Sequence, residues 1–215
     1  MSGLLDLFVA PAESHPARPR TREAAWVGPS PAAAVLGGAG DARAVARLLV
    51  AELRGHGRAQ CALVAEWHPE GTGLAGVRGG VAPAASRRLA ASLAGRGLAA
   101  APAGRTVRCA LPGEPGEAAA AWSRALAAAA CPAVLAVTGP RPPAFDGLLD
   151  DLDLIVIVRP EDADPDITAL AVAGLATLRP PVAITAPPPP GAALLPATGA
   201  RFLSADVTTL VRGLA

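Results

Sequence analysis

Short apolar runs alternate with amphipathic segments from residue 32 onward, and this alternation is the clearest pattern in the chain. The apolar runs carry few polar positions, as strands covered on both faces of a sheet do. We expect strands at residues 32–36, 61–66, 106–111, 133–137, 154–158 and 182–185, with a last one at 201–203.

The segments between these runs have the spacing of helices, with apolar side chains returning every three or four residues. In residues 41–54, one face carries Val45, Leu48, Leu49 and Leu53, and the opposite face carries Arg43, Arg47 and Arg54. We predict further helices at residues 84–94, 115–130, 145–151, 165–178 and 205–213.

Repeated alternation of strand and helix implies right-handed crossovers and a doubly wound α/β fold. We predict a mostly parallel sheet of six to seven strands with helices on both faces, a Rossmann-like or P-loop-like three-layer sandwich. Residues 1–31 are expected to form a partly flexible N-terminal arm, and residues 32–215 a single α/β domain. Ligands of such folds bind beyond the carboxyl ends of the strands.

The composition fits a globular domain and says little about function. Apolar residues make up 52% of the 215 positions, with only three Phe and three Trp among them. All 19 basic residues are arginine, and Ala, Gly, Arg and Pro abound, which indicates a GC-rich bacterial genome. No basic stripe is interleaved with aromatic residues, so nucleic acid is not expected as a partner.

The sequence predicts a cytoplasmic protein. The apolar run in Met1–Ala12 contains Asp6 and has no basic flank, which argues against a signal peptide. We expect membrane contact only indirectly or through this segment. Cys61, Cys109 and Cys131 lack the spacing of metal ligands and are expected to be buried free thiols in a reducing compartment.

The first predicted strand runs into a glycine-rich turn, Gly37-Gly38-Ala39-Gly40-Asp41, and a helix follows at once. Such turns hold phosphates, because the free N–H groups of a helix N-terminus attract anions and glycine lets a ligand approach the backbone. Asp41 stands where a phosphate loop needs a cation, and its carboxylate would repel a phosphate. Arg43 would offset part of that charge if it faced the turn.

This turn resembles the phosphate loop of the MinD/ParA group of P-loop ATPases, which carries Lys-Gly-Gly-x-Gly-Lys-Thr after its first strand. The glycines match at Gly37, Gly38 and Gly40. The position of the catalytic lysine holds Asp41, and that of the Mg²⁺-binding threonine holds Ala42.

The likeness covers most of residues 32–190 in the family's order, although no motif is intact. Glu66 and His68 occupy the two aspartate positions of the family's Asp-x-Asp-Pro turn. Residues 134–143 stand where the family has its Walker B strand, but they lack its acid. Residues 152–160 are similar to the next strand of the family.

The resemblance implies a non-catalytic scaffold or regulator with a protein partner, in pilus assembly as for TadZ-like members or in subcellular positioning. Phosphoryl transfer depends on a lysine, Mg²⁺ and an acid, so turnover of ATP is not expected. No cofactor is expected, and weak nucleotide binding through the amides of residues 37–40 stays open. The family dimerises across the face that carries its loop, which implies homodimer contacts near residues 37–43.

A nucleotide- or dinucleotide-binding enzyme or sensor is the alternative. Gly38-x-Gly40 opens a helix, and Glu66 at the end of the next strand imitates the ribose-binding acid of dinucleotide folds. Arg43 replaces the third glycine of that fingerprint, which weakens the match.

Three further groups have a structural interpretation beside a chemical one. Glu66, His68 and Glu70 could hold a metal or transfer protons, but a polar loop is favoured and no metal site is predicted. Arg141 could hold an anion, but a surface arginine in a proline-rich turn is favoured. The third group lacks the spacing of a calcium loop and is expected on a solvated helix face: Asp146, Asp150, Asp151 and Asp153.

Overall fold

A computed structural model describes residues 30–71, 74, 81–159, 174, 175, 178, 180 and 182–185. Seven strands form one sheet in the order β3-β4-β2-β5-β1-β6-β7. The strands are β1 (Ala32–Gly37), β2 (Ala62–Trp67), β3 (Ala99–Ala103), β4 (Thr106–Ala110), β5 (Ala133–Thr138), β6 (Leu154–Val158) and β7 (Val182–Thr185). All neighbours in the sheet pair in parallel except β3 and β4, so the predicted α/β class with a mostly parallel sheet is confirmed.

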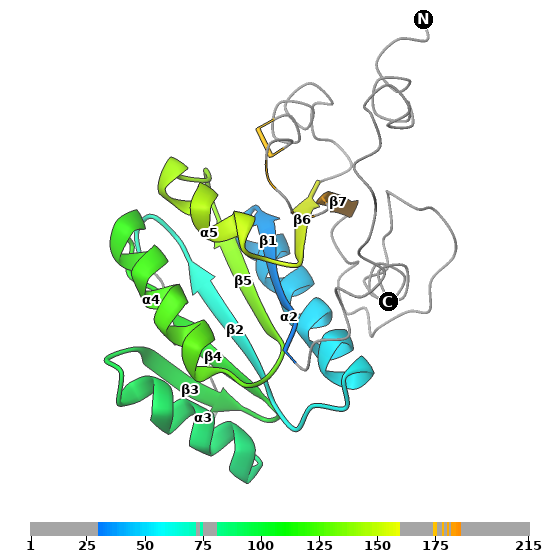
Figure 1. Ribbon diagram of the computed structural model, residues 1–215, viewed down its shortest axis with the longest axis vertical. Coiled ribbons are helices and arrows are strands. Elements are labelled where there is room, and N and C mark those ends of the chain that lie inside the picture. The colour runs from blue at the N-terminus through cyan, green and yellow to red at the C-terminus, as the bar shows by residue number, and fades with distance from the viewer. Residues whose placement is uncertain are drawn as a thin grey trace, which may run out of the picture.

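Helices cover both faces of the sheet (Figure 1). They are α2 (Ala39–His56), α3 (Ala84–Ala94), α4 (Pro115–Ala128) and α5 (Asp146–Asp150), with a 3₁₀ turn at Pro143–Phe145. Ala33 and Val35 of β1 pack with α2, whereas Ala32 and Ala34 face the core shared with the other helices. The alternation of side chains along each strand therefore supplies two cores, one on each face.

The local sequence explains several of the element boundaries. The α4 helix starts with Pro115 at its first position, and the Glu114 carboxylate caps it by accepting a hydrogen bond of 2.6 Å from the amide of Glu117. Hydrogen bonds from the amides of Glu117 and Gly116 lower the pKa of Glu114 below its ordinary value. The predicted bounds of α3, β6 and β7 agree with the structure.

One strand was absent from the predictions. The β3 strand pairs antiparallel with β4 at the edge of the sheet and reads Ala-Ala-Ala-Pro-Ala. Alanine and proline have little preference for strands, and proline is tolerated there because an edge strand has one row of unpaired groups. The hairpin turns at Gly104, whose φ of 60° favours glycine.

Several predicted segments lie outside the described residues. They are the arm at residues 1–31 apart from its last two positions, most of the helix at 165–178, the strand at 201–203 and the helix at 205–213. Within the described residues, none of the helices combines the length and the apolar character needed to cross a membrane.

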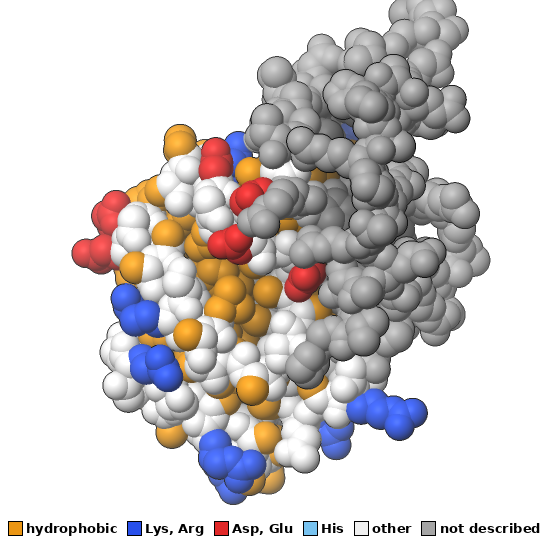
Figure 2. Space-filling model, in the orientation of Figure 1, with side chains coloured by type: hydrophobic (Ala, Val, Ile, Leu, Met, Phe, Trp, Pro, Cys, Tyr) orange, Lys and Arg blue, Asp and Glu red, His pale blue; other side chains and the backbone are white. Residues whose placement is uncertain are grey.

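Charges are unevenly spread over the face seen in Figure 2, with the acidic side chains in its upper half and most of the arginines in its lower half. The predicted solvated acidic face is only partly correct. Asp153 accepts a hydrogen bond of 2.9 Å from the amide of Ala32 at the start of β1, and Asp146 pairs with Arg141. Arg141 also donates to the carbonyl of Gly174 at 3.2 Å, so this arginine ties segments of the fold together.

Two buried thiols, Cys109 and Cys131, should make the folded protein less stable at alkaline pH. Burial raises the pKa of Cys109 from 9.0 to about 11, and burial together with the neighbouring Cys61 thiol raises the pKa of Cys131 to about 12. Above pH 9 the unfolded chain releases these protons while the folded chain keeps them, so rising pH favours unfolding. The chain has no Lys or Tyr to titrate in the same range.

We therefore expect full stability up to about pH 9 and a loss of about 1.4 kcal/mol per pH unit for each thiol above it. Urea denaturation at pH 8 and pH 10.5 measures this loss under reducing conditions. A double variant, Cys109→Ala with Cys131→Ala, should lose much less between the two pH values. An equal loss in both proteins would contradict the assignment.

Candidate functional site

The carboxyl ends of the parallel strands meet at one edge of the sheet, and the predicted site residues lie there. The strands β1 and β5 are neighbours, with Gly37 opposite Thr138. The amide of Gly139 donates to the carbonyl of Gly37 at 3.3 Å. The glycine-rich turn after β1 and the turn after β5 are thus side by side.

The turn between β1 and α2 is tighter than predicted. The helix starts at Ala39, two residues before the expected start, with Gly38 as its N-cap in an extended conformation. Gly40 and Asp41 therefore belong to its first turn. A β-carbon at Gly37 would come within 3.0 Å of the Val158 side chain, so β6 packs too closely for a larger residue.

Gly38 and Gly40 are not required by the surrounding packing. A β-carbon added at either position would meet no atom of the described residues within 4 Å, and neither glycine has a positive φ. In the described part of the chain, the backbone at the start of α2 is thus bare on this side. Bare amides at a helix N-terminus are the feature that a bound anion would use.

The next two residues differ in their surroundings. Asp41 is half-buried in the first turn of α2, where a carboxylate interacts favourably with the helix dipole. Ala42 is fully buried in the core between α2 and the sheet. Of these two residues, Asp41 therefore carries a negative charge at the helix N-terminus, and Ala42 packs inward.

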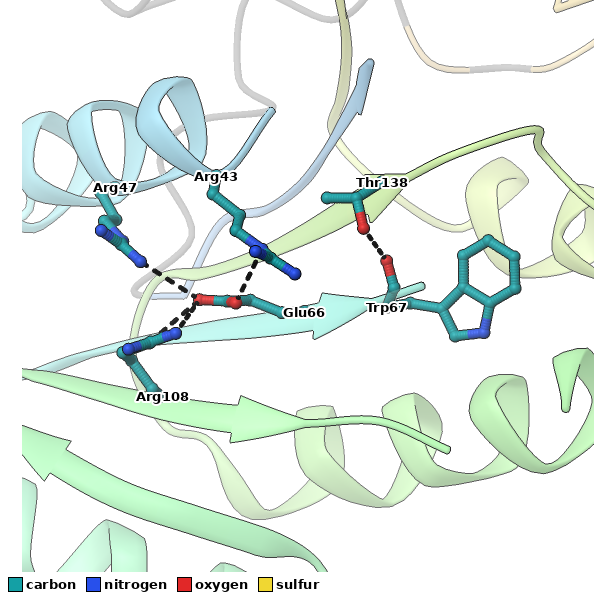
Figure 3. Close-up of polar contacts among 6 residues, drawn as sticks. All are labelled: Arg43, Arg47, Glu66, Trp67, Arg108 and Thr138. Carbon is teal, nitrogen blue, oxygen red and sulfur yellow. Dashed lines mark hydrogen bonds and ion pairs between the residues drawn. The ribbon is translucent and has the colours of Figure 1, made fainter. Parts of the chain in front are cut away.

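Glu66 is the centre of the charged cluster at this edge (Figure 3). It lies on β2 with its side chain toward α2, and the residue is only 3% exposed. Arg108 of β4 donates a hydrogen bond from Nε to Glu66 Oε1 at 3.0 Å. Its Nη2 lies 2.8 Å from the same oxygen. Arg43 Nε lies 3.2 Å from Oε2, and Arg47 Nη2 lies 3.7 Å from Oε1.

Among the described residues, the cluster combines three arginines with one carboxylate, a formal surplus of two positive charges. Arg108 is the most enclosed, with 14% of its side chain exposed, and Arg47 the least, with 53%. A buried carboxylate requires such partners, because an uncompensated charge away from water costs several kcal/mol. Glu66 and Arg108 therefore form the structural centre of the cluster, and Arg43 and Arg47 extend it toward solvent.

The sequence singled out two members of this cluster as candidate nucleotide-binding residues, but it did not predict their ion pair. Glu66 and Arg43 were candidates, but Arg43 and Arg47 were expected on the polar face of the helix, pointing away from the sheet. In the structure, the side chains of both arginines extend from α2 toward β2 and pair with Glu66. Arg108 was not predicted, and its only signal was an arginine inside an otherwise apolar strand of the sheet.

Trp67 organises the opposite face of the same strand end. Its carbonyl accepts a hydrogen bond of 2.6 Å from the hydroxyl of Thr138, and its indole Nε1 donates to the carbonyl of Gly113 at 3.2 Å. Its ring packs edge-on against Phe145, with 4.9 Å between the centroids. The loops after β4 and β5 are thus fixed to β2.

The remaining candidates do not converge on one site. The amide of Glu70 donates to His68 Nδ1 at 3.2 Å, so these two residues shape the loop after β2, while the Glu66 carboxylate lies among the arginines. In the described part of the chain, no group of three or more His, Cys, Asp or Glu side chains could hold a metal ion.

No model of a known protein family matches the chain, and no curated protein matches its sequence.

Proposed function

We propose that this chain is a non-catalytic scaffold or regulatory protein built on a degenerate MinD/ParA-like P-loop ATPase fold, and that it acts through protein contacts. The observation that carries the proposal is the charge of the turn after β1. Its lysine position holds Asp41, at the N-terminus of the helix that would receive the phosphates.

The other two catalytic positions carry no suitable group either. Ala42 is packed into the core and has no hydroxyl for Mg²⁺. Thr138, at the end of the strand that corresponds to Walker B, is fully buried, and its hydroxyl is bonded to the Trp67 carbonyl. Phosphoryl transfer depends on charge neutralisation and positioning, which these residues do not supply.

The topology supports the family part of the proposal. In a P-loop ATPase the phosphate loop and the Walker B acid act on one nucleotide, so their strands have to end close together. Here β1 and β5 are neighbours with Gly37 opposite Thr138. Pilus assembly or subcellular positioning is the family-level role, and homodimerisation through residues 37–43 is part of the proposal. A strict monomer in size-exclusion chromatography with light scattering would contradict the dimer.

Charge reversal at Asp41 tests the role of the turn. We expect MgADP and MgATP to leave the melting temperature of the wild-type protein unchanged, and Asp41→Lys to gain a measurable shift. Replacing a repulsive charge near a phosphate by an attractive one contributes about 1–3 kcal/mol, roughly a tenfold to hundredfold gain in affinity.

Glu52→Lys is the matched control, because it makes the same charge change on α2 three turns away from the glycines. If MgADP or MgATP raised the melting temperature of the wild-type protein by several degrees, the proposal would be contradicted. An equal response of both variants would show a general charge effect only.

Binding of an anionic ligand, such as a nucleotide, is the second candidate function. The surplus of arginine charge around Glu66 and the bare backbone at Gly38 and Gly40 favour it. Glu66 itself is a poor ribose acceptor, because it is buried and its two carboxylate oxygens face arginines. If the wild-type protein responds to nucleotide and Arg43→Ala abolishes the response, this second function replaces the first.

A further inference from the structure

The thiols of Cys61 and Cys131 are neighbours at the amino ends of β2 and β5, opposite the candidate site at the carboxyl ends of the strands. Cys61 directly precedes β2, and Cys131 lies two residues before β5. These strands pair in parallel with Leu63 opposite Ala133, and the amide of Leu63 donates to the carbonyl of Pro132 at 2.9 Å. Two residues back in this register, Cys61 lies opposite Cys131.

The side chains of this pair also point to the same face. Cys131 belongs to the core that α3 and α4 cover, and Cys61 packs against that core. Adjacent strands place opposing residues about 4.8 Å apart, within the Cα separation of 4.4–6.8 Å that a disulfide spans. In keeping with this proximity, the Cys61 thiol is among the causes that raise the pKa of Cys131. Cys109 is buried on β4 as a third free thiol.

We propose that Cys61 and Cys131 form a reversible disulfide and that a small-molecule disulfide, of which oxidised glutathione is the probe, is the oxidant. Cys61 is the attacking thiol, because it is half-buried whereas Cys131 is only 4% exposed. Its thiolate attacks one sulfur of glutathione disulfide and releases one glutathione thiolate. The Cys131 thiolate then attacks the Cys61 sulfur of the mixed disulfide and releases the second glutathione.

The two steps balance. Two protein thiols lose their protons and one pair of electrons, and one glutathione disulfide becomes two glutathione thiols. The bond would join the starts of β2 and β5, which are 70 residues apart in the chain. Such a long loop restricts the unfolded chain strongly, so oxidation should raise the melting temperature by about 5–10 °C.

Peptide mapping of the folded, full-length protein tests the proposal. Trypsin cleaves after arginine but not before proline, so each cysteine lies on its own peptide: residues 59–78, 109–124 and 125–201. After incubation with oxidised glutathione and alkylation, we expect a cross-link between the first and third peptides, which dithiothreitol reverses. The peptide with Cys109 should remain free of cross-links.

Variants identify the partners. Cys61→Ser and Cys131→Ser should each abolish the cross-link and the rise in melting temperature, whereas Cys109→Ser should keep both. Failure of the wild-type protein to cross-link, a glutathione adduct on Cys61 that never resolves, or a cross-link through Cys109 would each overturn the proposal. So would a disulfide that lowers the melting temperature.

Discussion

Glu66→Gln is expected to lower the free energy of unfolding by about 3 kcal/mol, the largest effect of any conservative change at the candidate site. The substitution keeps the size of the side chain and removes the carboxylate that pairs with Arg43, Arg47 and Arg108. Arg43 and Arg47 can turn partly toward water, but Arg108 is 14% exposed and would remain enclosed with an uncompensated charge. Urea denaturation at neutral pH measures the loss.

Glu52→Gln is the control for this change. It removes the same charge from α2, away from the cluster, and should alter stability by less than about 0.5 kcal/mol. The double variant Glu66→Gln with Arg108→Met should be more stable than Glu66→Gln alone, because it also removes the enclosed positive charge. If Glu66→Gln is as stable as the wild-type protein, the cluster is not the structural centre of this edge.

Gly113→Ala is expected to lower the free energy of unfolding by about 2–3 kcal/mol or more, which is the second large effect. A β-carbon at this position would come within 2.5 Å of the Pro69 carbonyl oxygen and 2.8 Å of the Gly71 amide nitrogen. Both are backbone atoms, so the loops after β2 and β4 would have to separate. The hydrogen bond from the Trp67 indole to the Gly113 carbonyl would then be strained as well.

Gly40→Ala is the matched control for Gly113→Ala. Gly40 lies inside α2, and a β-carbon added there would meet no described atom within 4 Å, so alanine should stabilise the protein by about 0.5–1 kcal/mol. Chemical denaturation of the two variants side by side measures both effects. Equal stabilities would contradict the close approach of the two loops.

The sequence predicted the architecture well because its signals are local. The apolar runs at β6 and β7 and the helical spacing of α3 each depend on a few neighbouring residues, and their bounds agree with the structure. The β3 strand escaped prediction because alanine and proline carry no strand preference, and its pairing with β4 is what makes it a strand.

The candidate site was harder to predict, because it depends on how strands are ordered and registered. Glu66 was a candidate from its place at a strand end, but its partners could not be known before β4 was placed beside β2. Arginine is also the only basic residue type that the chain uses apart from histidine, so each arginine was uninformative on its own. The neighbouring cysteines are a similar case, since 70 residues separate them and only the pairing of β2 with β5 brings them together.

The most direct test of the central claim is phosphate release from MgATP by the purified wild-type protein. A non-catalytic protein with Asp41 in the turn should release phosphate no faster than the buffer blank at any protein concentration. Release that rises in proportion to protein concentration and is lost in Arg43→Ala would contradict the claim and assign turnover to this edge of the sheet.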